Sequence, residues 1–454
     1  MTVLSIDDST LPEASTFAAL GVPAPLVAVL ADAGITSPRP VQAATLPDAL
    51  AGRDILGRAQ TGAGKTLGFS IPLVTRLSGG HTMACRPRGL VLVPTRELAA
   101  QVKTVLEPLA SSVGLTVATI IGGVPQRPQV AALRNRADII VACPGRLVDL
   151  VEQGHCDLSD VDVSVLDEAD HMADLGFLPV VRRLLEATPR DGQRLLFSAT
   201  LDGAIDVLAR RFLVRPARHS VDSASSPTRM THHLMTVTPA ERVAVIAALA
   251  SGEGRTLIFT RTKHGAKRLA RQLGAAGTPA AELHGNLTQG ARSRNLASFG
   301  SGEVRAMVAT DIAARGIHVD DIALVVHADP PAEFKAYLHR SGRTARGDAE
   351  GTVVTVQTAA QAAEVRALMR KAGVKPKADT VHPGSPVIRS IAGPAAPRTP
   401  QRAAAQGSRG ASGSAGARTG GGTGGNTGTL PASKGTGSGA AAMSAGFRGR
   451  GRRR

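Results

Sequence analysis

Residues 59–66 read Ala-Gln-Thr-Gly-Ala-Gly-Lys-Thr, directly after a short apolar run. Gly62 and Gly64 allow the backbone to turn tightly, so that its N–H groups point at phosphate oxygens. Lys65 can reach the β- and γ-phosphates of a nucleotide, and Thr66 can bind Mg²⁺. A strand before these residues and a helix after them predict a phosphate-binding loop. The loop alone indicates a nucleoside triphosphate and nothing more specific.

A second chemical motif follows the apolar run Val163–Leu166 and reads Asp-Glu-Ala-Asp at 167–170. A carboxylate at the end of a buried strand is where an enzyme with such a loop holds Mg²⁺, and Asp167 fits that role. Glu168 can orient and deprotonate an attacking water. Two acids at this place could instead cap the next helix, but the phosphate loop upstream favours the catalytic interpretation.

Short β-branched runs alternate with longer segments of helical period through the first 379 residues. The predicted strands include 90–93, 138–141, 163–166, 256–259, 304–309 and 322–326, and the predicted helices include 96–110 and 264–275. This alternation predicts an α/β fold with parallel sheets and helices on both faces. A polar segment at 221–230 divides it into domains at 1–220 and 231–379.

The final segment, residues 380–454, has a different composition. It contains eleven Lys and Arg, no Asp or Glu, and 18 Gly. It has too few large apolar groups to offset its chain entropy, so we expect a disordered basic tail. Such a tail can hold RNA through its phosphates or serve only as a solubilising linker.

Composition excludes several classes of protein. The chain has 454 residues and a net charge of +17, but only ten aromatic residues, which argues against a protein that stacks bases on aromatic platforms. The positive charge suggests a nucleic-acid partner. No apolar run is long enough to span a membrane, and the N-terminus has no basic signal segment. Three cysteines cannot form a disulfide framework, so we expect a protein of the reducing cytoplasm.

With the loop at 59–66, the Asp-Glu-Ala-Asp motif resembles that of the DEAD-box ATP-dependent RNA helicases. The resemblance extends from Phe17 to Ala372, and with its basic Gly-rich tail the chain looks like a bacterial member of that family. It implies two RecA-like parallel-sheet domains in tandem, with ATP and Mg²⁺ as cofactors. An amide such as Gln42 can pair with adenine, with Phe17 as the upstream aromatic. The implied nucleotide-binding residues are Phe17, Gln42, Thr61, Gly62, Ala63, Gly64, Lys65, Thr66, Asp167 and Gly316, with Thr66 and Asp167 holding the metal.

The remaining motifs occur in the family's order, and the resemblance assigns them roles. Arg343 and Arg346 are three residues apart and are expected to reach the γ-phosphate, joining Lys65 and Glu168 as catalytic residues. The residues implied to contact RNA are Arg96, Gly123, Arg146, Thr262, Gln289, Arg292 and Thr310. Those implied to couple hydrolysis to strand separation are Ser198, Thr200, Asp170 and Asp311.

Three positions depart from the family pattern. His318 stands where the family usually has Asp, a residue expected to contact the ATP ribose, which puts that contact in doubt. Ala345 replaces a usual Gly and Cys143 a usual Thr. Both replacements are small, so we expect them to be tolerated, with Cys143 a packed thiol.

The sequence therefore predicts an RNA-dependent ATPase that locally unwinds RNA duplexes by closing two domains on a single strand. We expect a monomer that binds RNA through its backbone, with proteins of ribosome assembly or RNA decay as candidate partners. Two alternatives are a slowly hydrolysing ATP-dependent RNA clamp and an RNA-annealing chaperone whose active part is the tail. A duplex-displacement assay distinguishes the first alternative, and removal of the tail distinguishes the second.

Overall fold

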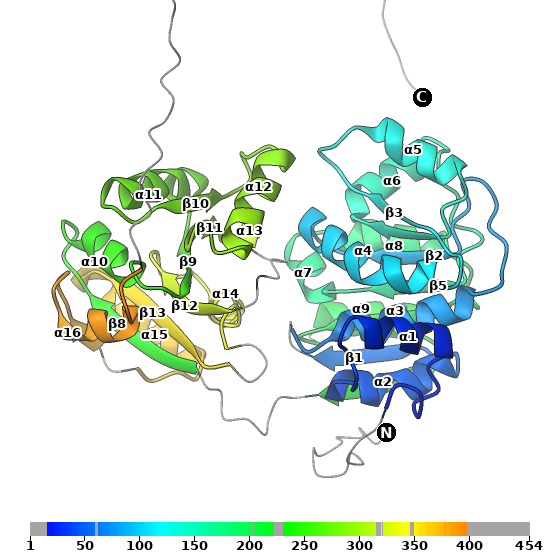
Figure 1. Cartoon of the computed structure of the whole chain (residues 1–454), viewed down its shortest axis with the longest axis horizontal. Coiled ribbons are helices and arrows are strands. Elements are labelled where there is room, and N and C mark those ends of the chain that lie inside the picture. Colours follow the sequence, from blue (N-terminus) through cyan, green and yellow to red (C-terminus); the bar gives the residue numbers. More distant parts are fainter. Residues whose placement is uncertain are drawn as a thin grey trace, which may run out of the picture. The chain divides into compact units, whose positions relative to one another are not determined.

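The chain folds into two α/β domains, which are described here one at a time (Figure 1). The computed structural model describes residues 16–59, 62–201, 203–221, 230–314, 319, 321–345, 349–376 and 378–396. Each domain is built around one seven-stranded sheet in which every pairing is parallel.

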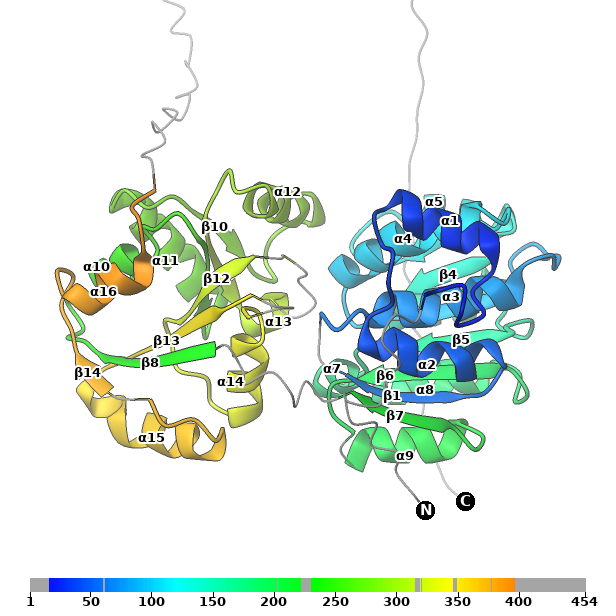
Figure 2. The ribbon, with the colours of Figure 1, turned by 60° about the horizontal axis from the view of Figure 1, so that its bottom comes forward.

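The first sheet has the strand order β3-β4-β2-β5-β6-β1-β7. Its strands are β1 (Ile55–Ala59), β2 (Gly89–Leu92), β3 (Val117–Ile120), β4 (Ile139–Ala142), β5 (Val163–Leu166), β6 (Gln193–Ser198) and β7 (Ala217–Val221). The helices between them are α1 (Ala24–Asp32), α2 (Pro40–Leu50), α3 (Lys65–Leu77), α4 (Arg96–Ser111), α5 (Gln126–Arg134), α6 (Pro144–Glu152), α7 (Ala169–Asp174), α8 (Leu178–Glu186) and α9 (Gly203–Phe212). Figure 2 shows β4, β5, β6, β1 and β7 one below another.

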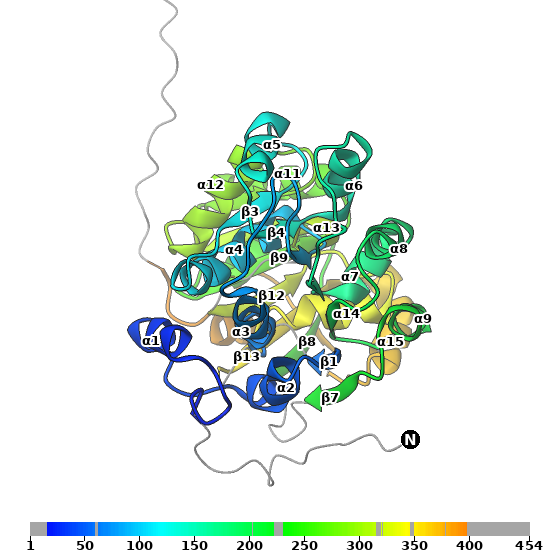
Figure 3. The ribbon, with the colours of Figure 1, turned by 90° about the vertical axis from the view of Figure 1, so that its right-hand side faces the viewer.

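Both faces of this sheet are covered because successive side chains of a strand point to opposite faces. On β1, Ile55 belongs to one apolar cluster and Leu56 to the other. Helices α1 to α4 pack on the first face, and α6, α8 and α9 pack on the second. Figure 3 shows α1, α3 and α4 on one flank and α6, α8 and α9 on the other. The central strands are therefore buried on both faces, which is why β2 and β4 read as continuous apolar runs.

The second sheet has the strand order β10-β11-β9-β12-β13-β8-β14. Its strands are β8 (Met230–Thr236), β9 (Arg255–Thr260), β10 (Ala280–Leu283), β11 (Ala306–Thr310), β12 (Ile322–His327), β13 (Gly351–Gln357) and β14 (Ala378–Thr380). Its helices are α10 (Arg242–Leu249), α11 (Lys263–Ala275), α12 (Gln289–Gly300), α13 (Asp311–Ala314), α14 (Phe334–Ser341), α15 (Ala362–Lys371) and α16 (Pro386–Ala392), with a short 3₁₀ turn η2 (Ala359–Gln361).

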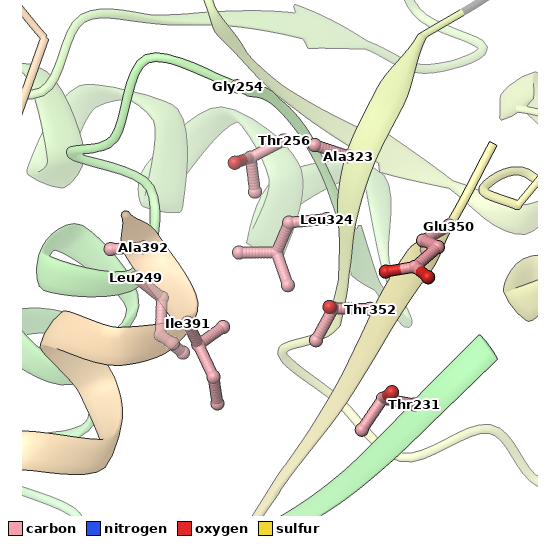
Figure 4. A pocket seen from close by; sticks show the side chains of 11 residues that line it. Thr231, Leu249, Gly254, Thr256, Ala323, Leu324, Glu350, Thr352, Ile391 and Ala392 are labelled. Carbon is pink, nitrogen blue, oxygen red and sulfur yellow. The ribbon is translucent and has the colours of Figure 1, made fainter. Parts of the chain in front are cut away.

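The last described segment of the second domain lies against α10 and the amino ends of the strands. Ile388 of α16 is 1% exposed and shares an apolar cluster with Val245 and Ile246 of α10. A cavity of about 220 Å³ remains beside α16. Figure 4 shows Leu249 and Ile391 on one side of it and Leu324 and Thr352 on the other.

The fold predicted from the sequence is confirmed, and the six quoted strands all form, shifted by two residues at most. The predicted boundaries need correction. The interval 221–230, predicted as a linker, begins in β7 and ends in β8, and its interior at 222–229 lies outside the described residues. The predicted tail boundary before residue 380 is wrong. Residues 380–396 are folded because a few apolar side chains among the Gly and Pro residues dock on α10, while 397–454 lie outside the described residues.

Within the described part of the chain, no helix combines the length and the apolar character needed to cross a membrane.

Candidate active site

The phosphate loop lies where β1 ends and α3 begins, at the carboxyl edge of the first sheet. Gly62 and Gly64 both have φ of +92°, in the left-handed region that favours glycine, so the loop can turn sharply. Gly64 caps α3 and, having no side chain, makes no side-chain hydrogen bond to the N–H groups of the helix's first turn. These N–H groups and the positive end of the helix dipole form a cradle for an anion.

Lys65 begins α3 and is 5% exposed. Its Nζ is 3.1 Å from Oε1 of Glu168 and 4.0 Å from Oδ1 of Asp167. Burial lowers the pKa of Lys65, but the carboxylates of Glu168 and Asp167 raise it by more, so its pKa lies above the usual value. The ammonium group therefore stays charged and is held beside Asp167 and Glu168, the first two acids of the second motif.

Asp167 follows β5 directly, at the same edge of the sheet. Burial raises its pKa to about 7, against the opposite effect of Lys65. Its Oδ1 is buried and has no hydrogen-bond partner among the described residues. A buried carboxylate oxygen without a donor suits a hard cation, which prefers oxygen ligands. Thr66, half-buried in the first turn of α3, can supply a hydroxyl from the same loop. These two residues fit Mg²⁺.

Glu168 adopts a left-handed backbone conformation, with φ of +56° and ψ of +48°. This region is unfavourable for a residue with a side chain and is found mainly where function or packing requires it. The conformation turns the chain from β5 into α7 while Glu168 contacts Lys65. Both acids of the motif therefore adjoin the phosphate loop.

The third acid of the motif binds the Ser-Ala-Thr segment at the end of β6. The N–H of Asp170 donates to Oγ of Ser198 at 3.2 Å. Oδ2 of Asp170 accepts from the N–H of Thr200 at 3.0 Å and from its hydroxyl at 3.3 Å. Three of the residues that the resemblance groups as coupling residues are therefore in contact, while their role in coupling stays a prediction.

Gln42 and Phe17, the residues predicted to read the base, contact other parts of the first domain. Gln42 is 2% exposed, and both ends of its amide are used: Nε2 donates to the carbonyl of Gly64 at 2.9 Å, and Oε1 accepts from the N–H of Arg39. Arg39 also reaches the carbonyl of Gly62 at 2.7 Å. Phe17 packs in the core beside α1. Base recognition by Gln42 and Phe17 stays a prediction. Arg39, which the sequence did not single out, binds the phosphate loop from outside.

The predicted RNA contacts of the first domain lie at the same carboxyl edge. Arg96 begins α4 after β2, and its guanidinium lies against Gly123, where an added Cβ would be 2.0 Å from Nη1. Gly123 has φ of +75°, which together with this close approach explains why a glycine is needed. Arg146 in the first turn of α6 donates to the carbonyl of Val124 at 3.4 Å. The structure therefore groups Arg96, Gly123 and Arg146 near one loop.

Cys143 precedes α6 and is buried. Burial raises the pKa of this thiol to about 12, so it is protonated near neutral pH and unreactive, as expected of a packed thiol.

The corresponding residues of the second domain lie at the carboxyl ends of its strands. Thr262 caps α11 by accepting from the N–H of Gly265 at 3.0 Å, Gln289 begins α12, and Thr310 ends β11. Arg292 lies one turn into α12 and donates to the carbonyl of His284. RNA contact by these residues stays a prediction.

Asp311 pairs with Arg340, a residue to which the sequence assigned no role. Nε and Nη2 of Arg340 donate to its two carboxylate oxygens at 2.5 and 2.7 Å. Arg340 is 3% exposed, lies over the ring of Phe259 and donates to the carbonyl of Asp329. This bidentate pair fixes α14, the helix that leads to Arg343. A charged side chain in the last turn of a short helix gave no sequence signal for such burial.

Arg343 follows α14 and is buried, with Nε donating to the carbonyl of His339 at 3.3 Å. Its predicted reach to a γ-phosphate stays a prediction. Ala345 has φ of +53°, a left-handed conformation that favours glycine, which explains why the family usually has Gly at this position. Thr61, Gly316, His318 and Arg346 lie outside the described residues.

A phosphate loop, a strand-end acid pair and two RecA-like sheets place the chain in the class of P-loop proteins. The sequence matches two family models, the DEAD/DEAH box helicase at residues 39–207 and the helicase conserved C-terminal domain at residues 240–348. The chain belongs to the DEAD-box RNA helicase family.

Its similarity to individual members covers most of the chain. It is 39% identical to DEAD-box ATP-dependent RNA helicase 28 of Oryza sativa over 81% of this chain and 47% of that protein. It is 35% identical to DEAD-box ATP-dependent RNA helicase 20 of Arabidopsis thaliana over 82% of this chain and 76% of that protein. The chain spans about half the length of the first of these curated relatives. Both relatives come from plants, so the expectation of a bacterial type is not borne out.

Solved structures show the same architecture. The chain superposes on S. cerevisiae Dbp5 bound to RNA and ADP BeF3 with a TM-score of 0.73 and 25% identity, covering 84% of this chain and 100% of that one. The DEAD-box helicase Mss116 bound to ssRNA and UDP-BeF gives a TM-score of 0.70 and 26% identity, over 83% and 82% of the two chains.

Proposed function

We propose that this protein is an RNA-dependent ATPase that locally unwinds or remodels RNA duplexes. The observation that carries the proposal is the cluster at the carboxyl edge of the first sheet. There Lys65 contacts Glu168 at 3.1 Å and Asp167 at 4.0 Å, directly at the phosphate loop. Relatives named as ATP-dependent RNA helicases, and solved structures that hold RNA together with a nucleotide, support the same function.

ATP would bind with its phosphates on the N–H groups at the start of α3. Lys65, kept charged by two buried acids, would exchange part of that ion pairing for the β- and γ-phosphates. Thr66 and Asp167 would hold Mg²⁺, since Oδ1 of Asp167 is buried without a donor among the described residues. The metal, when bound, neutralises negative charge on the phosphate oxygens.

Glu168 would act as the general base. Its carboxylate would accept a proton from the water that attacks the γ-phosphate, so the proton moves to a glutamate oxygen while the bond to the leaving ADP oxygen breaks. The contact with Lys65 orients this carboxylate beforehand, and the left-handed backbone at residue 168 sets its direction. Preorganisation of this kind reduces the rearrangement needed during the reaction.

Asp170 would connect hydrolysis with RNA. It follows the two catalytic acids in sequence and binds both Ser198 and Thr200 at the end of β6. A change at the γ-phosphate that shifts α7 would therefore alter the Ser-Ala-Thr segment as well. In the second domain, the pair between Asp311 and Arg340 fixes α14 and would position Arg343 for transition-state stabilisation.

RNA would be held mainly through its backbone, which gives little sequence preference. Arg96 and Arg146 of the first domain and Thr262 and Arg292 of the second are the proposed contacts. ATP and RNA would close the two domains together, so each ligand should tighten the other by the same factor.

We further propose that the protein works as a monomer in the cytoplasm. The three cysteines are all free, which suits a reducing compartment. Proteins of ribosome assembly or RNA decay are the proposed partners, and the basic segment beyond residue 396 would add non-specific RNA affinity.

The test is Glu168→Gln, which keeps the size and hydrogen-bonding capacity of the side chain but removes the base. We expect RNA-stimulated ATP hydrolysis to fall by a factor of about 10²–10⁴, with ATP and RNA affinities largely retained. Glu186→Gln, on an exposed glutamate of the same domain that pairs with Arg211, is the matched control and should hydrolyse normally. Undiminished hydrolysis in Glu168→Gln would overturn the assignment.

A duplex-displacement assay separates this function from an RNA clamp. A helicase displaces strands faster with ATP than with a non-hydrolysable analogue and recycles. A clamp binds RNA with either nucleotide and does not turn over. Displacement that never exceeds one event per protein would favour the clamp.

A further inference from the structure

A cavity of about 470 Å³ opens at the amino edge of the first sheet. Four arginines line it: Arg53 before β1, Arg76 in the last turn of α3, Arg190 before β6 and Arg215 before β7. The phosphate loop follows the other end of β1, a five-residue strand about 17 Å long. The cavity and the nucleotide site therefore lie at opposite edges of one sheet.

The acidic residues at this cavity do not balance the arginines. Asp54 is already satisfied, because its two carboxylate oxygens accept from the N–H groups of Arg194 and Val214, each at 2.7 Å. Asp191 is the other acid in the wall. Arg53 pairs with Asp48. Within the described chain, the other three cavity arginines have no ion-pair partner, so the cavity carries an excess of positive charge.

A buried arginine holds the cavity's walls in place. Arg194 donates to the carbonyls of Pro189 at 2.7 Å, Arg190 at 3.0 Å and Phe212 at 3.2 Å. These bonds fix the loop that carries Arg190 and the end of α9, just before the loop that carries Arg215. The cavity is therefore organised by the fold and does not depend on a ligand to form.

Two backbone features place the arginines themselves. Gly52 has φ of +81°, and an added Cβ there would be 3.1 Å from Nη1 of Arg76, so the guanidinium of Arg76 lies against a position without a side chain. Arg215 has φ of +43°, where glycine or asparagine would be favoured. This backbone conformation disfavours any side chain, and the chain nevertheless places an arginine there.

We propose that this arginine pocket, formed by Arg53, Arg76, Arg190 and Arg215, binds phosphates of an RNA strand outside the motif-lined site. Guanidinium groups donate in a planar fork that matches phosphate oxygens. Several exposed arginines around one open cavity can take successive phosphates of a strand. The proposal rests on RNA binding within the proposed function, but it does not depend on ATP turnover.

The pocket gives RNA a second anchor on the first domain. A strand or duplex arm that extends beyond the motif-lined site would be held at the opposite edge of the same sheet. Long RNAs should therefore bind more tightly than short ones, and the additional affinity should depend steeply on salt.

The experiment uses the full chain carrying Arg76→Gln, Arg190→Gln and Arg215→Gln together. Its matched control carries Arg183→Gln, Arg210→Gln and Arg211→Gln, which removes the same charge from exposed arginines of the same domain. Each control arginine pairs with a carboxylate, respectively Glu152, Asp206 and Glu186. RNA affinity is measured over a salt series, with a short oligonucleotide and with a single strand several times longer. Circular dichroism checks that both variants are folded.

For the long strand, we expect the pocket variant to lose about 0.7 in the slope of log affinity against log salt for each lost phosphate contact. Three contacts give a slope change of about 2, so a fourfold rise in salt should weaken the native chain's binding by roughly 20 times more than it weakens the pocket variant's. Short-oligonucleotide binding and ATP hydrolysis at saturating RNA should be unchanged. A failure of the pocket is thereby distinguished from a failure of the ATPase, which Glu168→Gln tests separately.

Equal losses in the two triple variants would show that only overall charge matters and would refute the pocket. An unchanged salt slope in the pocket variant would refute it as well. Tripolyphosphate is the probe for a free-phosphate ligand. If it binds the native chain but not the pocket variant, while both bind long RNA equally, the pocket takes free polyphosphates and RNA as its ligand is wrong. A single Arg76→Gln variant, changed at one exposed helix end, repeats the measurement should the triple variant be unfolded.

Discussion

Gly252 fixes how α16 docks on the second domain, and its replacement by alanine makes a sharp test of the structure. Gly252 lies in the turn between α10 and β9 and forms an antiparallel bridge with Ala395. A Cβ at this position would be 1.8 Å from the carbonyl oxygen of Ala392, the last residue of α16. The obstacle is backbone, so Gly252→Ala cannot be accommodated unless α16 moves.

The free-energy cost of displacing α16 follows from the interactions that hold this helix on the second domain. Full burial of Ile388 is worth about 1.5–3 kcal/mol. Two hydrogen bonds also hold the segment: Glu253 donates from its N–H to the carbonyl of Pro394, and Ala396 to that of Ser251, both at 3.0 Å. Each contributes about 1 kcal/mol. Because part of the packing can relax, we expect Gly252→Ala to destabilise the second domain by about 2–4 kcal/mol.

The chain's composition supplies the assay. It has one tyrosine and no tryptophan, and Tyr337 is buried on α14 of the second domain. Tyrosine fluorescence during denaturant unfolding therefore reports on that domain alone, which avoids a two-domain transition. Trypsin cleavage after Arg389, an exposed residue of α16, reports on docking separately.

Gly274→Ala is the matched control, because nothing lies within 4 Å of a Cβ placed in that helix. This variant should stabilise the domain by about 0.5–1 kcal/mol through helix propensity. The two substitutions are chemically identical and should have opposite effects. If Gly252→Ala unfolds at the same denaturant concentration as the native chain, with unchanged cleavage at Arg389, α16 does not dock as described.

Three further predictions use the same chain. Ala345→Gly should stabilise the second domain by about 1 kcal/mol, because it relieves a φ of +53°, and a lower unfolding midpoint by tyrosine fluorescence would contradict this. Burial is the main cause that holds the pKa of His327 well below its usual value, and the positive charges of Arg340 and His232 add to it. The stability that comes with the neutral ring is therefore fully present above about pH 6.5 and is lost as the pH falls. His327→Gln should flatten the unfolding free energy between about pH 5 and 7 by up to 1.4 kcal/mol per unit, and an unchanged pH profile would argue against the buried ring. Ending the chain after Ala396 removes ten of the eleven basic residues beyond position 379. This truncation should weaken RNA binding and make its dependence on salt shallower, while ATP hydrolysis continues. Equal affinity across the salt series would make the removed segment a linker, and loss of strand annealing alone would favour the chaperone.

The strands and the catalytic motifs could be predicted because their signals are local. Val163–Leu166 is buried on both sides and apolar at every position but Ser164, and β5 has those same bounds. The phosphate loop combines glycines, a lysine and a threonine whose spacing is set by the phosphates they bind. The resemblance grouped Asp170 with Ser198 and Thr200, and the structure adds the reason for their bonds, since the end of β6 lies beside the end of β5.

The C-terminal docking could not be predicted in the same way. Residues 380–396 are rich in Gly, Pro and Ala, and composition assigned them to the tail. Their order depends on Val381 and Ile388 entering a cluster made mainly by residues more than a hundred positions earlier in the chain. A seven-residue helix has little stability of its own, so only the tertiary contact decides whether it forms.

Backbone conformation at individual residues is equally hidden from the sequence, and it distinguishes Ala345 from Glu168 and Arg215. All three adopt positive φ, where a glycine would avoid the steric cost. The methyl group of Ala345 offers no chemistry that could offset this cost, so glycine should improve the position. Glu168 carries the proposed base, and its carboxylate must meet Lys65 at the phosphate loop, so glycine there would remove the function along with the strain. Arg215 resembles Glu168 in this respect if the arginine pocket binds RNA, because its guanidinium is then the reason for keeping a side chain in a left-handed conformation.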